Sequence, residues 1–481
     1  MKKVLALSAL LLAGCTTVGP DYERPAAPAD GAYVPPAPPA GAPAAALGQG
    51  PATRWWEAFG SPELDELVDR AIAGNQTLAA SNATLERARE RIAALAGERL
   101  PQVDVNPGAS RQEVNLASFG FDPASFGITG GNPIFNLYSV GGGVSYDLDL
   151  FGGKKRAIEQ AAAQAEAQLH EAEAAHLTIA GRVVNQALTI AAIRARIATA
   201  TAVIDDGQRN FELTDARRRA GKGNMVDVLQ AQSCLTADKA ALPQLEQQLA
   251  EARNMLAILL GIAPTELGAT DFDMADFTLP ANVPVALPSA LVHQRPDILQ
   301  AEADLHAATA GVGVATAKLY PDITLGATLT QSSPGIGSIL DEGFRAFDIF
   351  AGVTAPIFHG GTLKAEKRGA EAETRAAAAT YRETVIEAFG QVANLLGALD
   401  TDARGLAAQQ DAAAIAEQSR ELSQKAYRAG SGTVLQVIDA DRTWQQARAG
   451  LDEARARQLL NVARLYVATA GGWTGPAQAA R

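Results

Sequence analysis

Aromatic residues, cysteines and histidines are scarce in this chain of 481 residues. Aromatic side chains make up 5% of the sequence, and there are two cysteines and five histidines. A disulfide framework is excluded, because Cys15 is predicted below to be lipidated and Cys234 then has no other cysteine to pair with. We interpret Cys234 as a small packing residue. Abundant alanine and glycine with few aromatics favour closely packed helices over a bulky globular core.

Positive charge and catalytic motifs are also missing. The formal net charge is −12, whereas a nucleic-acid-binding surface would need a basic face. His170 and His176 are not spaced to share one helix face, and the glycine run 138–143 lacks the Lys-Ser/Thr pair of a phosphate loop. We read Asp147 and Asp149 as a polar stripe on a strand rather than a catalytic carboxylate pair. We therefore predict no enzymatic activity, no cofactor and no metal site.

The first residues predict a lipoprotein. Lys2 and Lys3 precede the apolar run 4–12, which is too short to span a bilayer. Leu12-Ala13-Gly14-Cys15 resembles the bacterial lipobox, whose cysteine is acylated and becomes the mature N-terminus. We predict a signal peptide over 1–14 and lipidation of Cys15. Outside this leader no uninterrupted apolar run of about 20 residues occurs, so we expect no membrane-spanning helix.

Two similar stretches, Arg219–Ala231 and Arg428–Ala440, organise the rest of the chain. In each, a Gly-x-Gly sequence ends a long alanine-rich helical run, because glycine adopts the left-handed conformation without a steric penalty. Asn224 and Thr433 then supply N-caps for a second run. The sequence therefore predicts two helical hairpins and an internal duplication. The tip glycines are Gly221, Gly223, Gly430 and Gly432.

Apolar residues recur at heptad spacing along each hairpin, which predicts coiled-coil packing. The first run has no strong stop before Gly221, so it would form a helix roughly 100 Å long. Before each hairpin, apolar and polar residues alternate in two segments, which predicts a pair of strands. Trp55, Trp56 and Phe59 are expected to pack in the core where the folded part begins.

These patterns give the predicted domain organisation. A Pro- and Ala-rich tether over 15–53 follows the signal peptide. The remaining segments are a first repeat over 54–265 (strands near 100–112 and 135–150, hairpin near 154–261), a linker over 266–288, a second repeat over 289–473 (strands near 320–331 and 346–358, hairpin near 361–470) and a tail over 474–481.

Strands of this length, apolar on one face, are typical of an outer-membrane barrel. Four strands cannot close a barrel, and an eight-stranded barrel is filled by its own side chains. Three copies would give 12 strands and an open passage. The sequence therefore predicts an α+β membrane protein: a trimeric 12-stranded outer-membrane β-barrel, continued by a 12-helix periplasmic α-barrel of coiled-coil hairpins.

The chain resembles an outer-membrane factor of the TolC-like family, in the lipoprotein branch that serves tripartite RND-type multidrug efflux systems. The resemblance extends over essentially the whole mature chain. It rests on Tyr22-Glu23-Arg24-Pro25, Trp55-Trp56-Glu57-Ala58-Phe59, Asp147-Leu148-Asp149-Leu150-Phe151-Gly152, Arg295-Pro296-Asp297-Ile298, the two hairpin tips and Gly471-Gly472-Trp473. It implies a homotrimer in the outer membrane that extends into the periplasm and binds a periplasmic adaptor and an inner-membrane pump.

The resemblance also implies a periplasmic gate near the tips. Asp227 and Asp439 match acidic constriction residues of the family, and Val434 and Leu435 lie beside them. The four tip glycines would form the adaptor-contact surface. Gln436 replaces one family carboxylate and Gly432 replaces a tip arginine, so closure would depend more on Val434, Leu435 and packing.

Two other functions stay open at this point. The same duct could serve a type I protein secretion system, and an adaptor lipoprotein also carries a coiled-coil hairpin behind a lipobox. An adaptor has one hairpin, whereas this sequence predicts two, each after a strand pair. The leading interpretation is an exit duct that expels small toxic compounds. The sequence does not identify those compounds, the particular adaptor and pump, or the resting state of the gate.

Overall fold

The computed structural model describes residues 17–26, 42–115, 120, 132, 134–268 and 270–469. Cys15, the signal peptide, the middle of the tether, Gly471-Gly472-Trp473 and the tail lie outside the described residues. The chain divides into two compact units. A sheet unit comprises Met1–Arg24, Glu86–Glu166 and Ala303–Ala379, and a helical unit comprises Pro25–Leu85, Ala167–Glu302 and Thr380–Arg481.

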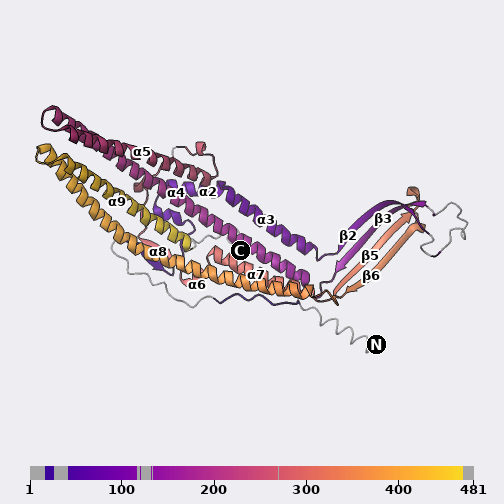
Figure 1. The fold of residues 1–481 in the computed structure, drawn as a ribbon. Coiled ribbons are helices and arrows are strands. Elements are labelled where there is room, and N and C mark those ends of the chain that lie inside the picture. The colour runs from indigo at the N-terminus through magenta and orange to yellow at the C-terminus, as the bar shows by residue number, and fades with distance from the viewer. Residues whose placement is uncertain are drawn as a thin grey trace. The chain divides into compact units, whose positions relative to one another are not determined.

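The sheet unit holds one antiparallel sheet in the order β2-β3-β5-β6, drawn as four arrows in Figure 1. Its strands are β2 (Gln102–Glu113), β3 (Ile134–Asp147), β5 (Asp322–Ser333) and β6 (Arg345–Thr354). The four predicted strands are confirmed. The two repeats join where β3 pairs with β5, from Tyr138 opposite Ser333 to Asp147 opposite Thr324. Strands β2 and β6 are the two edges.

Strands β3 and β6 end earlier than predicted. After β3, Asp149 has φ of 46°, a conformation that a strand cannot contain. After β6 comes Pro356, which has no N–H for the ladder.

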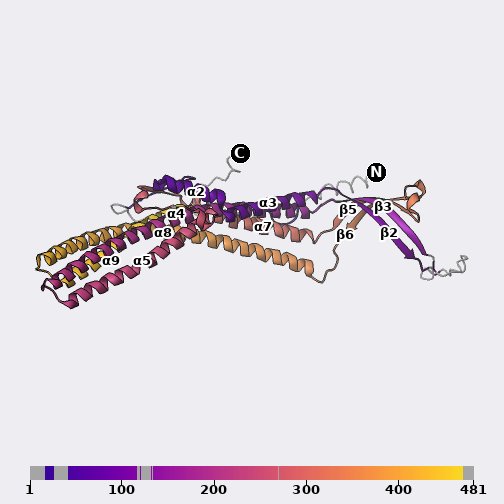
Figure 2. The same cartoon turned by 90° about the horizontal axis from the view of Figure 1, so that it is seen from above.

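Long helices make up most of the helical unit. The first hairpin is α4 (Gly153–Arg219) and α5 (Met225–Leu260), and the second is α8 (Thr362–Ala429) and α9 (Val434–Ala468). The paired helices of each hairpin run side by side in Figures 1 and 2. Helices α4 and α8 have 67 and 68 residues and begin in the sheet unit. The predicted hairpins and their great length are confirmed.

The predicted heptad positions form the core of the helical unit. Ile179, Val183 and Ile190 of α4 and Val385 and Val392 of α8 are all buried. By length and composition α4 could cross a membrane, since one 18-residue window has a mean hydropathy of 1.5. The sequence predicted no such helix, because no uninterrupted apolar run of about 20 residues occurs outside the leader. Only 28% of that window is buried in the single chain, and length and composition alone are weak evidence for a membrane span.

Smaller elements complete both units. They are β1 (Ala44–Leu47), η1 (Trp55–Phe59), α2 (Pro62–Gly74), α3 (Gln76–Gly97), η4 (Pro264–Glu266), η5 (Met274–Asp276), β4 (Asn282–Val285), α6 (Pro288–Leu291), α7 (Pro296–Ala317), η6 (Ile336–Ser338) and η7 (Glu342–Phe344). Trp55, Trp56 and Phe59 are buried, as predicted, and Trp55 stacks on Tyr466 of α9 at 5.4 Å between ring centroids.

Segments that the sequence assigns to the tether and the linker pair with each other. Strand β1 lies parallel to β4, with Ala44 opposite Asn282 and Leu47 opposite Val285. Val283 and Val285 are fully buried, so this short ladder is part of the core. Pro- and Ala-rich composition did not reveal the pairing, because it depends on a partner far away in the sequence.

The duplication is visible in how each return helix is fastened. In the first repeat the Asn75 side-chain amide, just before α3, donates to Leu259 O at 2.8 Å near the end of α5. In the second, Arg295, just before α7, donates to Ala468 O at 3.2 Å at the end of α9. The two repeats thus use different residue types for the same connection. Arg295 of the Arg-Pro-Asp motif also donates to Asp297 and Gln391, each at 2.8 Å.

Candidate functional site at the hairpin tips

The first tip is a tight turn fastened by backbone hydrogen bonds. Gly221 has φ of 75°, and its N–H donates to Arg218 O at 2.9 Å. Lys222 N–H donates to Arg217 O at 2.8 Å, which ends α4. Asn224 then caps α5, since its side-chain oxygen accepts from Asp227 N–H at 2.8 Å. Both the glycine stop and the Asn224 cap agree with the sequence prediction.

The second tip has the same plan and tighter packing. Gly430 has φ of 84°, and the N–H groups of Ser431 and Gly432 both donate to Ala426 O at 3.0 Å. Thr433 and Gln436 form a capping box at the start of α9. A Cβ at Gly432 would lie 3.0 Å from Tyr427 N, so a larger residue there requires the turn to shift. This contact disfavours a larger side chain at the position where the family resemblance suggests arginine.

The residues predicted to form a gate occupy different environments. Val434 is 4% exposed and packs with Tyr427 and Val437, whereas Leu435 is 62% exposed. Asp227 is half-buried in the first turn of α5, and Asp439 is exposed on α9. Of the two apolar gate candidates, Val434 therefore packs within the tip, whereas the side chain of Leu435 is exposed. The gate role of all four residues stays a prediction.

Contacts between the two hairpins near the tips were not foreseen from the sequence. Arg217 of α4 donates to Tyr427 O of α8 at 2.7 Å, and its guanidinium lies 4.5 Å from the Tyr427 ring centroid. The hydroxyls of Thr214 and Tyr427 are 3.0 Å apart, and both residues are buried. These contacts tie the end of α4 to the end of α8.

A charged cluster lies further from the tip. Arg420 of α8 forms ion pairs with Asp206 of α4 and with Asp441 of α9, the latter at 3.1 Å. Its guanidinium also lies 4.1 Å from the Trp444 ring centroid. Asn210 of α4 donates to Asp441 at 2.8 Å, so three helices meet at this cluster. Burial raises the pKa of Asp441, although Arg420 acts in the opposite direction.

The sequence does contain a signal for this cluster. Asp206, Asn210, Thr214 and Arg217 follow the buried Val203 at three- or four-residue spacing, so they share one face of α4 toward the tip. A polar stripe on a coiled coil usually faces solvent. What identifies it as an interface is the matching polar set on α8 and α9, which only the fold brings close.

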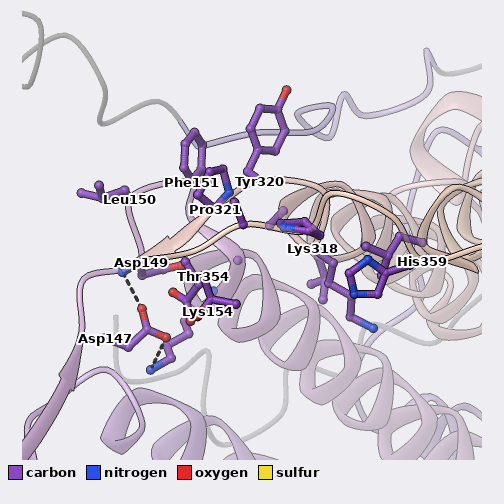
Figure 3. A pocket seen from close by; sticks show the side chains of 17 residues that line it. Asp147, Asp149, Leu150, Phe151, Lys154, Lys318, Tyr320, Pro321, Thr354 and His359 are labelled. Atoms are coloured by element: carbon purple, nitrogen blue, oxygen red, sulfur yellow. Dashed lines mark hydrogen bonds and ion pairs between the residues drawn. The ribbon is translucent and has the colours of Figure 1, made fainter. Parts of the chain in front are cut away.

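The sheet unit has a pocket of about 450 Å³ where strands meet helices. Figure 3 shows Asp147, whose carboxylate accepts from Asp149 N–H at 2.9 Å and pairs with Lys154 at 3.0 Å. Asp149 caps α4 by accepting from the N–H groups of Lys154 and Lys155, each at 2.9 Å. Both carboxylates thus fasten the strand–helix connection.

The segment Thr17–Arg24 packs against the helices of the same unit. Val18 N–H donates to Phe151 O at 3.1 Å, and Tyr22 stacks on His306 of α7 at 4.3 Å between ring centroids. Arg156 of α4, whose side chain is 4% exposed, pairs with Asp21 at 2.6 Å. The described segment that begins at Thr17 is therefore fixed to the helices that adjoin the sheet.

Comparisons with known proteins agree with this architecture. A family profile described as outer membrane efflux protein matches residues 67–262 and 287–471, one match in each repeat. The pyoverdine export outer membrane protein OpmQ of Pseudomonas aeruginosa is 31% identical, over 99% of this chain and 98% of that protein. Outer membrane protein OprJ of the same species is 30% identical, over 98% and 97% respectively. The solved structure of the outer-membrane channel OprN superimposes with a TM-score of 0.85 at 28% identity, covering 95% of this chain and all of that one.

Proposed function

Because the chain belongs to the outer membrane efflux protein family, we propose that three copies form the exit duct of a tripartite pump. The duct would be a 12-stranded barrel in the outer membrane, continued by a tube of the long hairpins. Its cargo would be small toxic compounds delivered by an inner-membrane RND-type pump. A periplasmic adaptor would bind at the tips. There, no neighbouring atom lies closer than 3.8 Å to the position of a Cβ at Gly221 or Gly430.

The observation that carries this proposal is the pair of unpaired sheet edges. Nearly every residue of β2 and β6 is exposed in the single chain. On their apolar face, Val103, Val105, Phe347 and Ile349 are 69–77% exposed. Lipid is the solvent that such a face requires, and edges inside a membrane must pair because no water can satisfy their backbone groups. Closure with further copies of the chain meets both requirements.

The names of the relatives favour export of small molecules over export of protein. OpmQ is named for pyoverdine export, and relatives from Pseudomonas putida are named for toluene, solvent and antibiotic efflux. A protein secretion duct remains the second candidate, since its fold would be the same. The adaptor alternative does not explain two hairpins with a strand pair before each.

Retention of a fluorescent lipophilic dye tests the proposal. Cells that lack the gene should retain more dye than the parent strain, and the intact gene should restore efflux. The matched variant is Gly221→Val, which changes a tip and leaves the sheet unaltered. Equal retention in the deleted and parent strains, with new loss of an exported protein from the culture medium, would support the secretion duct instead.

A further inference from the structure

A cavity of about 310 Å³ opens in the helical unit beside the end of α9. Its volume lies in the range of small-molecule pockets, about 300–1,000 Å³. Three arginines line it: Arg182 of α4, Arg295 just before α7, and Arg464 of α9. The other residues of its described wall are uncharged. The chain as a whole has a formal net charge of −12, so this hollow is a place of local positive charge in an acidic protein.

The three cations have one carboxylate partner between them in the described part of the chain. Arg295 pairs with Asp297 at 2.8 Å. Arg464 donates to the neutral side chain of Asn461 at 3.3 Å. Arg182 forms neither an ion pair nor a hydrogen bond with any described residue. Because a guanidinium presents its donors in a fork that matches a carboxylate, the cavity offers more charge and more donors than the chain itself satisfies.

An unpaired polar group in the same wall is a second, independent observation. Asn185 of α4 lines the cavity, and its side-chain oxygen is buried without a hydrogen-bond partner among the described residues. Buried polar groups are nearly always paired, so an unpaired one requires an explanation. An asparagine amide carries an acceptor at one end and two donors at the other, and rotation exchanges them. A polar ligand in the cavity would therefore pair with Asn185 whichever group it presents.

The cavity lies on the side of α4 that faces away from the core of the helical unit. Val183 and Ala187 of α4 are fully buried in the core that also contains Trp55 of η1. Arg182 and Asn185 share the opposite side of the helix, since residues three apart lie on one face. In an open tube of long helices, the smaller elements packed on the core side must lie outside, because inside they would fill the passage. The cavity then faces the lumen.

We infer that this cavity binds the carboxylate group of an organic anion in the lumen of the duct. The inference rests on the proposed function and names a class of cargo for it, small compounds that carry a carboxylate. Arg182 and Arg464 bind the carboxylate, Arg295 adds positive charge, and Asn185 pairs with a second polar group of the compound. A neutral lipophilic compound makes none of these charge-assisted hydrogen bonds.

Binding of carboxyfluorescein to the purified trimer tests the site. Fluorescence anisotropy should show saturable binding that benzoate reverses and benzamide, of similar shape but without charge, does not. Arg182→Gln with Arg464→Gln should weaken binding about tenfold or more, because charge-assisted hydrogen bonds are lost. Wild-type affinity in this double variant would overturn the inference.

A matched control removes the same charge away from the cavity. Arg404 and Arg457 each pair with an acid on their own helix, Asp400 and Glu453, and do not line the cavity. Arg404→Gln with Arg457→Gln should therefore bind carboxyfluorescein as the wild type does. Equal weakening in both double variants would show a general effect of net charge and would also overturn the site.

Asn185→Asp supplies a variant that keeps every arginine. The new carboxylate lies in the cavity beside the arginines, so it should prevent binding of the probe while native gels still show trimers. Probe binding at wild-type affinity in Asn185→Asp would overturn the inference, whether or not the arginine variant folds.

Efflux from cells separates this inference from the proposed function. Cells can be loaded with carboxyfluorescein as its diacetate ester, which cellular esterases convert to the anion. Cells that lack the gene should retain more carboxyfluorescein, and Arg182→Gln with Arg464→Gln should restore efflux of the neutral lipophilic dye but not of carboxyfluorescein. If only the neutral dye depends on the gene, the anionic cargo is wrong and the duct stands. If neither dye depends on it, the proposed function fails.

Discussion

Removal of the Arg420 charge should loosen both hairpin tips. The side chains of Arg420, Asp206 and Asp441 are 15–17% exposed, so the ion pairs are largely shielded from water. Arg420→Met would leave Asp441 without a cation and Asp206 paired only with Arg209, whose side chain is 67% exposed. Removing one partner of a buried ion pair costs about 3–5 kcal/mol, and loss of the contact with Trp444 adds about 0.5–2 kcal/mol. Because some solvent reaches the cluster, we expect a loss of about 3 kcal/mol.

Native-state hydrogen exchange measures this loss directly. A loss of about 3 kcal/mol corresponds to roughly a hundredfold faster exchange where local opening governs the rate. Peptides from the tip halves of α4, α8 and α9 should show the change, whereas peptides from α2 should not. Exchange within threefold of wild type at the tips would refute the reasoning.

A charge-balanced variant separates charge from packing. The triple variant Asp206→Asn, Arg420→Met and Asp441→Asn carries no buried charge at the cluster. Replacing a whole buried ion group is often close to neutral, so most of the lost protection should return. If the triple variant exchanges as fast as Arg420→Met alone, the stacking of Arg420 on Trp444 is the stabilising contact and the ion pairs are not.

Four further outcomes are expected. Burial holds the pKa of Asp441 above its ordinary value, so the folded tips bind a proton that the unfolded chain releases. Protection of the tips from hydrogen exchange should therefore fall as the pH rises through the range just above about 4. Asp441→Asn should remove this pH dependence of exchange. Gly221→Val or Gly430→Val places a side chain at positive φ, at a cost of about 1–2 kcal/mol, and should abolish dye efflux while native gels still show trimers; normal efflux would contradict the tip role. Arg156→Ala should expose the segment after Cys15 to protease, detected by N-terminal sequencing, since its ion pair with Asp21 is lost; unchanged resistance would show that backbone contacts suffice. Cys15→Ala should abolish incorporation of labelled fatty acid but leave the chain in the outer membrane, because the strands hold it there; label in the variant would place the lipid elsewhere.

Local sequence patterns foretold the regular elements well. Alternation located four strands, and heptad spacing with Gly-x-Gly stops located the hairpins, because these signals depend on neighbouring residues only. The errors have two causes, a pairing between residues far apart in the sequence and a local break that the alternating pattern overlooked. Pairing of β1 with β4 joins two proline-containing segments that share no local signal, and the early end of β6 follows from Pro356, which the alternating pattern had included.

In the candidate site, too, some features follow from local residue types and others depend on residues far away in the sequence. The tip glycines and the Asn224 and Thr433 caps follow from residue type, and the structure places them as expected. Burial of Val434 could not be predicted, because it requires Tyr427 and Leu213 from two other helices. The pairing of Arg420 with Asp206 likewise joins the two repeats, and no pattern within either repeat specifies it.

The fixed position of the chain's beginning determines an order of events. Val18 hydrogen-bonds to Phe151, and Gly19 lies so close to Gly313 that a Cβ there would be 2.4 Å from the Gly313 Cα. Those partners belong to different repeats, so the segment with Val18 and Gly19 can take its final position only after the chain has been made past Gly313. The N-terminal segment can therefore pack only when the sheet and its adjoining helices are complete. An acyl group on Cys15 would hold that end at the membrane surface throughout the interval, so that the duct is assembled where it is used.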